Sequence, residues 1–255
     1  MKLGLVTYNM AKDWDVPTII ENCVATGFRG VELRTTHAHC VEVNLSSNER
    51  REVRKQFEGS PIELAGLGSA FDYHSTDADE VRQNIEGTKE YAQLAADVGA
   101  PGVKVRPNGL PEGVSTEKTL NQIGLSLREC GESAKSLGVQ IRLEVHGRET
   151  SHVPHIQTIM EIADHDNVFV CWNSNPGEVD DGSVENNFNL VKEWIRLVHI
   201  NELHRREYPW RELFTLLQAS GYEGYTLAEI PESSDPVRVM NYYSALWEAL
   251  GNAPR

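Results

Sequence analysis

The chain alternates short β-rich runs with longer amphipathic runs, and this alternation constrains its fold more than any other feature. Apolar runs predict strands at 2–7, 29–34, 62–67, 102–107, 139–145, 167–173, 195–201 and 223–230. Amphipathic runs predict helices at 15–26, 47–58, 77–98, 116–137, 152–164, 183–193, 209–220 and 234–250. Apolar strands joined by helical crossovers are typical of a parallel sheet. Eight such units with no leftover segment predict an α/β fold, a (β/α)8 TIM barrel forming a single domain over 1–255.

Glycines mark the points where several of these helices end. Gly27, Gly99, Gly138 and Gly221 lie where helix C-caps are expected, because glycine tolerates a left-handed backbone there. The structural alternative is a doubly wound open sheet. No G-x-G-x-x-G motif follows the first strand, which removes the usual reason to prefer that alternative.

Composition excludes some classes of function. The chain has 255 residues, 40% hydrophobic content and a formal net charge of −14, so it can bury a full core. An acidic surface repels a phosphate backbone, and we therefore expect no nucleic-acid partner. No apolar run approaches the roughly 20 residues of a membrane span, and MKLGLVTYNM reads as a first strand rather than a signal peptide.

The cysteine pattern bears on the compartment. Cys23, Cys40, Cys130 and Cys171 show no C-x-x-C spacing and read as reduced thiols that mostly serve packing. We therefore expect a soluble, cytoplasmic protein without a membrane partner.

Each of the last four predicted strands carries one potential metal ligand near its C-terminal end: Glu144, Asn173, His199 and Glu229. In a closed barrel these ends meet at one mouth. Two carboxylates, an imidazole and an amide oxygen suit Mn²⁺, Mg²⁺, Co²⁺ or Zn²⁺ better than a thiolate-loving metal. Each residue also has a simpler interpretation, because a strand histidine is often a hydrogen-bonded core residue and an asparagine often caps a loop.

Further polar residues follow the other predicted strands. Glu32, Lys104 and Arg106 lie at or near strand ends, and His74 lies in the loop that follows the third strand. His146 lies two residues after Glu144, so it faces the same side if the strand continues. Glu202 and His204 follow the seventh strand. This distribution fits the rule that TIM-barrel chemistry lies at the C-terminal mouth, although solvated loop positions are equally typical of such residues.

The chain resembles the sugar isomerase/epimerase superfamily of xylose-isomerase-like TIM barrels, and the resemblance covers essentially its whole length. The segments that carry it are GFRGVELR, LGSAFDYHSTD, LGVQIRLEVHG, VFVCWNSNP, RLVHINELH and GYTLAEIP. In members that resemble ketose 3-epimerases, four metal ligands come from the ends of the last four strands. The resemblance implies that Glu144, Asn173, His199 and Glu229 are these ligands, with both glutamates as acid/base groups. It also implies that Arg205, six residues after His199, contacts substrate oxygen.

Two positions depart from that pattern. Asn173 stands where an aspartate is usual, so the ligand set carries about −2 rather than −3, which weakens metal affinity. Pro176 stands where such epimerases often have a substrate-binding histidine.

The leading functional hypothesis is a divalent-metal-dependent sugar isomerase or epimerase that removes a proton next to a carbonyl through an enediolate. The residues expected to contact substrate are Arg205, His146, Lys104, Glu202 and His74. The alternatives are a metal-dependent dehydratase or lyase of inosose, dehydroshikimate or 3-keto-glycoside type, and a non-catalytic sugar-binding barrel. An endonuclease is disfavoured by the acidic charge. The expected partner is a small sugar or polyol-derived molecule, and a homo-oligomer stays open.

Overall fold

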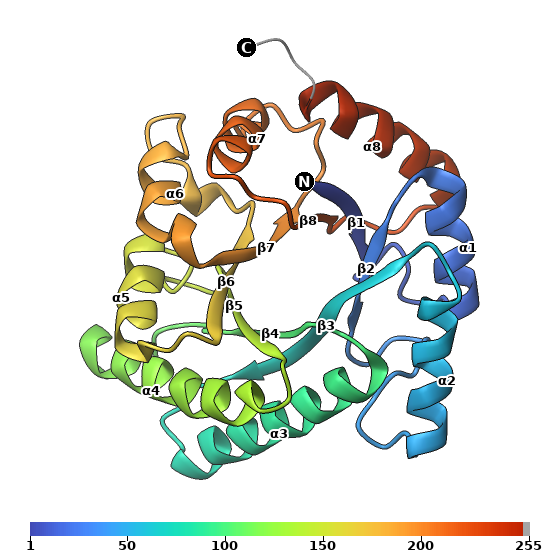
Figure 1. The fold of residues 1–255 in the computed structure, drawn as a ribbon. Coiled ribbons are helices and arrows are strands. Elements are labelled where there is room, and N and C mark those ends of the chain that lie inside the picture. Colours follow the sequence, from blue (N-terminus) through green and yellow to red (C-terminus); the bar gives the residue numbers. More distant parts are fainter. Residues whose placement is uncertain (252–255) are drawn as a thin grey trace.

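A computed structural model describes residues 1–251 and gives a closed barrel of eight parallel strands in chain order, ringed by helices (Figure 1). The strands are β1 (Lys2–Val6), β2 (Gly30–Arg34), β3 (Glu63–Asp72), β4 (Gly102–Arg106), β5 (Gln140–Glu144), β6 (Val168–Asn173), β7 (Ile195–Ile200) and β8 (Tyr225–Ala228). The helices are α1 (Val16–Thr26), α2 (Ser47–Glu58), α3 (Ala78–Val98), α4 (Thr116–Lys135), α5 (Val153–Ala163), α6 (Glu185–Val191), α7 (Trp210–Ala219) and α8 (Pro236–Gly251). The predicted TIM barrel is confirmed.

Local sequence signals explain where the first helices begin and end. The Asp15 side chain caps α1 by accepting from the Thr18 backbone N–H at 2.9 Å, and Ser46 with Glu49 forms a capping box on α2. Gly27 and Gly99 end α1 and α3 in the left-handed conformation, with φ of 78° and 86°. The predicted roles of these two glycines are confirmed.

Three segments differ most from the sequence prediction. The strand predicted at 223–230 is shorter, since β8 covers only Tyr225–Ala228. The strand predicted at 62–67 continues to Asp72, because β3 keeps pairing with β4 beyond an irregularity between Gly68 and Asp72. The helix predicted at 183–193 is shorter: α6 ends at Val191, and a 3-10 turn over Lys192–Trp194 follows it.

The core has two parts. A large apolar cluster lies between the strands and the surrounding helices. A second cluster consists only of strand residues and packs inside the barrel: Val6, Ala65, Cys171, Leu197, Tyr225 and Leu227. The rest of the barrel interior, toward the C-terminal ends of the strands, contains buried polar side chains such as Glu32, Glu144 and His199. Within residues 1–251, no helix is long and apolar enough to cross a membrane.

Candidate active site at the barrel mouth

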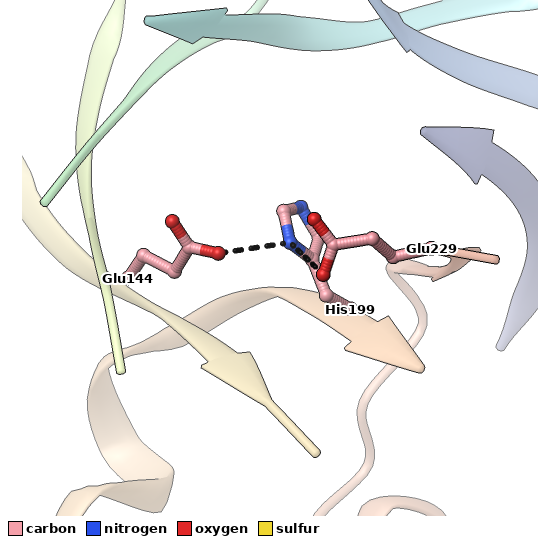
Figure 2. Close-up of side chains that lie close together, drawn as sticks. All are labelled: Glu144, His199 and Glu229. Carbon is pink, nitrogen blue, oxygen red and sulfur yellow. Dashed lines mark ion pairs between the residues drawn. The ribbon is translucent and has the colours of Figure 1, made fainter. Parts of the chain in front are cut away.

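Three of the predicted ligands converge at the C-terminal mouth of the barrel. Glu144 ends β5, His199 lies in β7 and Glu229 directly follows β8. Figure 2 shows the imidazole between the two carboxylates, with Nδ1 of His199 3.4 Å from Oε1 of Glu144 and 3.9 Å from Oε2 of Glu229. One ligand atom from each residue lies within 4.8 Å of the others. The barrel therefore brings together three side chains that are far apart in the sequence.

Asn173, the fourth predicted ligand, belongs to the same cluster. Its Nδ2 donates to Oε1 of Glu144 at 3.0 Å, whereas its Oδ1 is buried and has no hydrogen-bond partner. A half-turn of the amide would bring Oδ1 to the Glu144 carboxylate, and a cation between the two oxygens would stabilise that arrangement. The residue is thus within reach of the site, and one of its polar atoms is left unsatisfied.

Lys104 occupies the other oxygen of Glu144. Its Nζ donates to Oε2 at 2.8 Å, and both side chains are almost fully buried. Lys104 comes from β4, the strand next to β5, and pairs in register with Arg142. A buried carboxylate needs such a partner, because an unpaired charge is very costly away from water.

Glu32 is a further buried carboxylate that the sequence prediction did not assign to the site. Its Oε1 lies 3.3 Å from Nε2 of His199, on the opposite side of the imidazole from the Glu144 contact, yet neither oxygen has a hydrogen-bond partner. A Cβ at Gly68 would lie only 2.8 Å from Oε1, so the glycine leaves the room that the carboxylate fills. The sequence signal that could have identified Glu32 is its place within the apolar run GVELR, because a glutamate in a buried strand needs a partner.

The charges around the imidazole shift the protonation of each group. Burial alone would raise the pKa of Glu144, but the Lys104 ammonium and then His199 outweigh it and hold the pKa below its ordinary value. Burial opposes a charge on His199, but its neighbours Cys171 and Glu32 outweigh it and raise the pKa of the imidazole. Burial, opposed by His199, raises the pKa of Glu229. The two glutamates are therefore tuned in opposite directions, as acid and base pairs in active sites often are.

A cavity of about 340 Å³ opens over these groups. Its lining residues come from the ends of seven strands or the loops that follow them: Tyr8, Arg34, Lys104, Arg106, Glu144, His146, Asn173, Asn175, Asn201 and Glu229. Lys104 and His146, two of the predicted substrate contacts, are among them. Asn175 and Asn201 were not predicted, because each lies two residues beyond an assigned ligand in a loop whose course the sequence pattern does not give.

The other three predicted substrate contacts do not line this cavity. Arg205 is half exposed, and its Nη2 pairs with Oε2 of Glu202 at 3.2 Å. Glu202 lines a neighbouring, mostly apolar pocket against α8. His74 pairs with Asp72 at 3.1 Å and lines a separate pocket. Substrate contact by these three residues stays a prediction.

A second polar network lies beneath the β6–α6 loop. Glu178 is fully buried, and its Oε2 accepts from the Tyr208 hydroxyl at 2.8 Å, while Nε1 of Trp172 donates to the same hydroxyl at 3.1 Å. Oε1 of Glu178 has no partner, and burial raises the pKa of this carboxyl well above its ordinary value. The network ties the loop after β6 to the loop after β7, and so supports the side of the mouth that carries Asn173.

Comparison with known proteins assigns the family. The model of the xylose isomerase-like TIM barrel family matches residues 20–246, and the chain belongs to this family. No curated protein matches the sequence.

Several solved structures share the fold at low sequence identity. D-psicose 3-epimerase with D-tagatose from Clostridium cellulolyticum H10 is 15% identical with a TM-score of 0.82, and the match covers 99% of this chain and 100% of that one. The probable 3-DHS dehydratase AsbF from Bacillus anthracis, involved in petrobactin synthesis, is 16% identical with a TM-score of 0.74 and full coverage of both chains, 100% each. The IOLI protein with a binding zinc atom is 15% identical with a TM-score of 0.75, covering 98% of this chain and 96% of that one.

Proposed function

We propose that this protein is a divalent-metal-dependent sugar isomerase or epimerase that moves a proton on the carbon next to a carbonyl, through an enediolate. The observation that carries the proposal is the convergence of Glu144, His199 and Glu229, with ligand atoms within 4.8 Å, below a polar cavity at the barrel mouth. The family membership and the epimerase of the same fold support the sugar class of substrate.

The residues fit a divalent ion. Ligands about 2.1 Å from one ion stand roughly 3–3.5 Å apart. The His199–Glu144 separation of 3.4 Å lies in that range, and the His199–Glu229 separation of 3.9 Å lies somewhat above it. A plain buried ion pair would have similar spacing, but it would leave Oδ1 of Asn173 without a partner. A similar structure carries zinc, and the oxygen and nitrogen donors equally suit Mn²⁺, Mg²⁺ or Co²⁺. Glu144, Asn173, His199 and Glu229 would hold the ion.

A bound ion would polarise the substrate carbonyl and stabilise the negative charge that develops when the neighbouring proton leaves. The protein's own residues do the rest. Glu229 lines the cavity, and 3.9 Å separates its Oε2 from His199, so it is the group that takes and returns a proton. Lys104 and Asn173 hold the Glu144 carboxylate in place. Glu144 exchanges a proton with the face of the substrate opposite to Glu229. Positioned acid–base groups of this kind contribute about 10²–10⁴-fold each.

Two predicted contacts have the geometry to position substrate. Lys104 lies against Glu144 in the cavity, and Nδ1 of His146 is buried in the same cavity without a partner. We propose that both bind substrate oxygen atoms. Arg205, Glu202 and His74 lie outside this cavity, and substrate contact by them stays part of the proposal without support from the geometry. The cytoplasm stays the proposed compartment, because all four cysteines are free thiols and three of them are buried.

A dehydratase or lyase is the second candidate. The same site would remove the proton and then expel a neighbouring hydroxyl instead of returning the proton. The probable dehydratase of this fold and the unpartnered Nδ1 of His146 favour it, since the imidazole could hydrogen-bond the leaving oxygen.

The proposal is tested by incubating the Mn²⁺-loaded protein with a panel of ketoses and keto-polyols in D₂O. An isomerase or epimerase incorporates deuterium next to the carbonyl without loss of mass, and Glu229→Gln abolishes the incorporation. Loss of water identifies the dehydratase. If a panel that includes phosphorylated and carboxylated sugars shows neither exchange nor elimination, the enzymatic proposal gives way to a sugar-binding barrel.

A further inference from the structure

Two arginines line the cavity without an ion-pair partner among residues 1–251. Arg34 ends β2 and Arg106 ends β4, and both line the cavity together with Lys104. Lys104 is paired with Glu144 at 2.8 Å. For Arg34 and Arg106, the part of the chain that the structure describes contains no carboxylate within ion-pair distance, although acidic residues outnumber basic ones, 38 to 24. A chain with this excess of carboxylates could have paired both arginines internally. Two unpaired guanidinium groups at one cavity therefore indicate that an anionic ligand binds there.

Each guanidinium group is held in place by a few contacts, and some of its N–H donors remain without a partner. Nη2 of Arg106 donates to the Ala70 carbonyl at 2.8 Å, while its Nε is buried without a partner. Nη1 of Arg34 lies 3.4 Å from Nε2 of His37, and the guanidinium carbon lies 5.1 Å from the centre of the Tyr8 ring. A guanidinium has five N–H groups in a rigid fork, so most donors of both residues stay available.

The strand between the two arginines, β3, contributes no residue to the lining of the cavity. In the barrel order, β3 lies between β2 and β4, and Gly68 of β3 pairs with Arg34 on one side and Lys104 on the other. Gly68 has no side chain, and even a Cβ there would meet Glu32 Oε1 at 2.8 Å. The Glu32 carboxylate takes the room beside Gly68, so the space for a ligand is the cavity that Arg34, Lys104 and Arg106 line.

The cavity is thus divided by charge. Glu144 and Glu229 lie on the side of β5 and β8, and the two arginines lie on the side of β2 and β4. We propose, on the basis of the function proposed above, that the substrate is an anionic sugar whose carboxylate or phosphate is bound by Arg34 and Arg106. Its carbonyl end then faces Glu144 and Glu229. Planar, bidentate donors are suited to both oxyanions, and a cavity of about 340 Å³ accommodates one sugar unit with such a group.

The test compares two anions and one neutral polyol on chelator-treated protein. The probes are inorganic phosphate, D-gluconate and D-glucitol, observed by ligand NMR titration. We expect the wild type to bind phosphate or gluconate at least about tenfold more tightly than glucitol, since hydrogen bonds to charged groups are stronger than those to neutral groups. Arg34→Gln and Arg106→Gln each lose that preference, and Arg106→Lys recovers part of it.

Arg211→Gln is the matched control, because Arg211 is exposed on α7, outside the cavity. It keeps the preference of the wild type. Tighter binding of phosphate points to a phosphorylated sugar, and tighter binding of gluconate points to a sugar acid. Equal binding of the three probes, or anion binding that survives in both Arg→Gln variants, overturns the proposal.

A parallel Mn²⁺ titration separates this proposal from the proposed function. Arg106→Gln binds Mn²⁺ as the wild type does, because the arginine is not a candidate ligand. A wild type that binds Mn²⁺ but prefers neither anion overturns only the anion site. A wild type that prefers an anion but binds no divalent ion supports the anion site and contradicts the metal-dependent function.

Discussion

Nζ of Lys104 lies 2.8 Å from Oε2 of Glu144, and the two side chains are only 6% and 3% exposed. This contact joins neighbouring strands at the level where the candidate metal ligands meet. It supplies Glu144 with a cation in the absence of an ion, and it leaves Oε1 of Glu144 facing His199. The pair therefore sets both the charge of the site and the orientation of one carboxylate.

Replacing Lys104 with Met should destabilise the metal-free protein by about 3–5 kcal/mol, because a buried carboxylate loses its partner. Unfolding in urea with a chelator present measures the loss. The control is Lys135→Met, whose surface pair with Asp166 is well exposed on both sides and should cost about 0–1 kcal/mol. Added Mn²⁺ should stabilise Lys104→Met more than the wild type, since the ion then replaces the ammonium. Equal losses in the two variants would show that the buried pair has no special role.

Glu32→Gln should weaken Mn²⁺ binding by about 10–100-fold, the usual effect of losing a group that orients a metal-bound histidine. The carboxylate lies 3.3 Å from Nε2 of His199 and favours a proton on that nitrogen, which leaves Nδ1 free to face Glu144 and Glu229. A Mn²⁺ titration measures the effect. The control Glu63→Gln removes a carboxylate that pairs with Lys2 on the surface and should leave the affinity unchanged. Equal affinity in Glu32→Gln and the wild type would contradict this positioning role.

Asn173→Asp should have opposite effects with and without metal. Without an ion, the new carboxylate would replace the amide donor at Oε1 of Glu144 with a like charge, so the free energy of unfolding should fall. With an ion, the added charge should tighten Mn²⁺ binding by about tenfold or more. Melting curves with chelator and with Mn²⁺ test both parts. A variant that is destabilised equally in both conditions would argue against Asn173 as a ligand.

Glu178→Gln should change the pH dependence of stability. The pKa of Glu178 is raised in the folded protein, so the folded state holds a proton that the unfolded state releases above about pH 4.5. This contribution to stability is complete at lower pH and is lost as the pH rises toward the folded pKa. The amide mimics the protonated carboxyl and does not titrate.

Urea unfolding of the wild type and Glu178→Gln at pH 5 and pH 8 tests this prediction. The variant should gain stability relative to the wild type at pH 8 and little or nothing at pH 5. The acceptor for the Tyr208 hydroxyl is retained in the amide, so the network itself is kept. A difference between the two proteins that is the same at both pH values would show that Glu178 is already ionised.

The sequence predicted most of the fold because barrel strands are buried on both faces. Their apolar runs are therefore separated clearly from the amphipathic helices. It also predicted Glu144, His199 and Glu229, because each ends or follows a strand and all strand ends meet at one mouth. β3 was predicted too short, since its last residues, Ser69 to Asp72, include exposed and polar positions that look like a loop.

Contacts between distant strands and the courses of the loops were harder to predict. The approach of Glu32 to His199 joins β2 to β7 across the barrel, and no local pattern encodes that distance. The family resemblance implies that Arg205 contacts substrate, and that role stays a prediction; in the structure its side chain pairs with Glu202 in the loop after β7. The network of Glu178, Tyr208 and Trp172 depends on two such loops at once.

The metal content of the protein after addition of Mn²⁺ and removal of excess ion tests the central claim most directly. Elemental analysis should find one ion per chain in the wild type and in Glu248→Gln, a control on the exposed face of α8, and none in Glu229→Gln. The same stoichiometry in all three proteins, or no bound ion in the wild type, would contradict the metal centre formed by Glu144, His199 and Glu229.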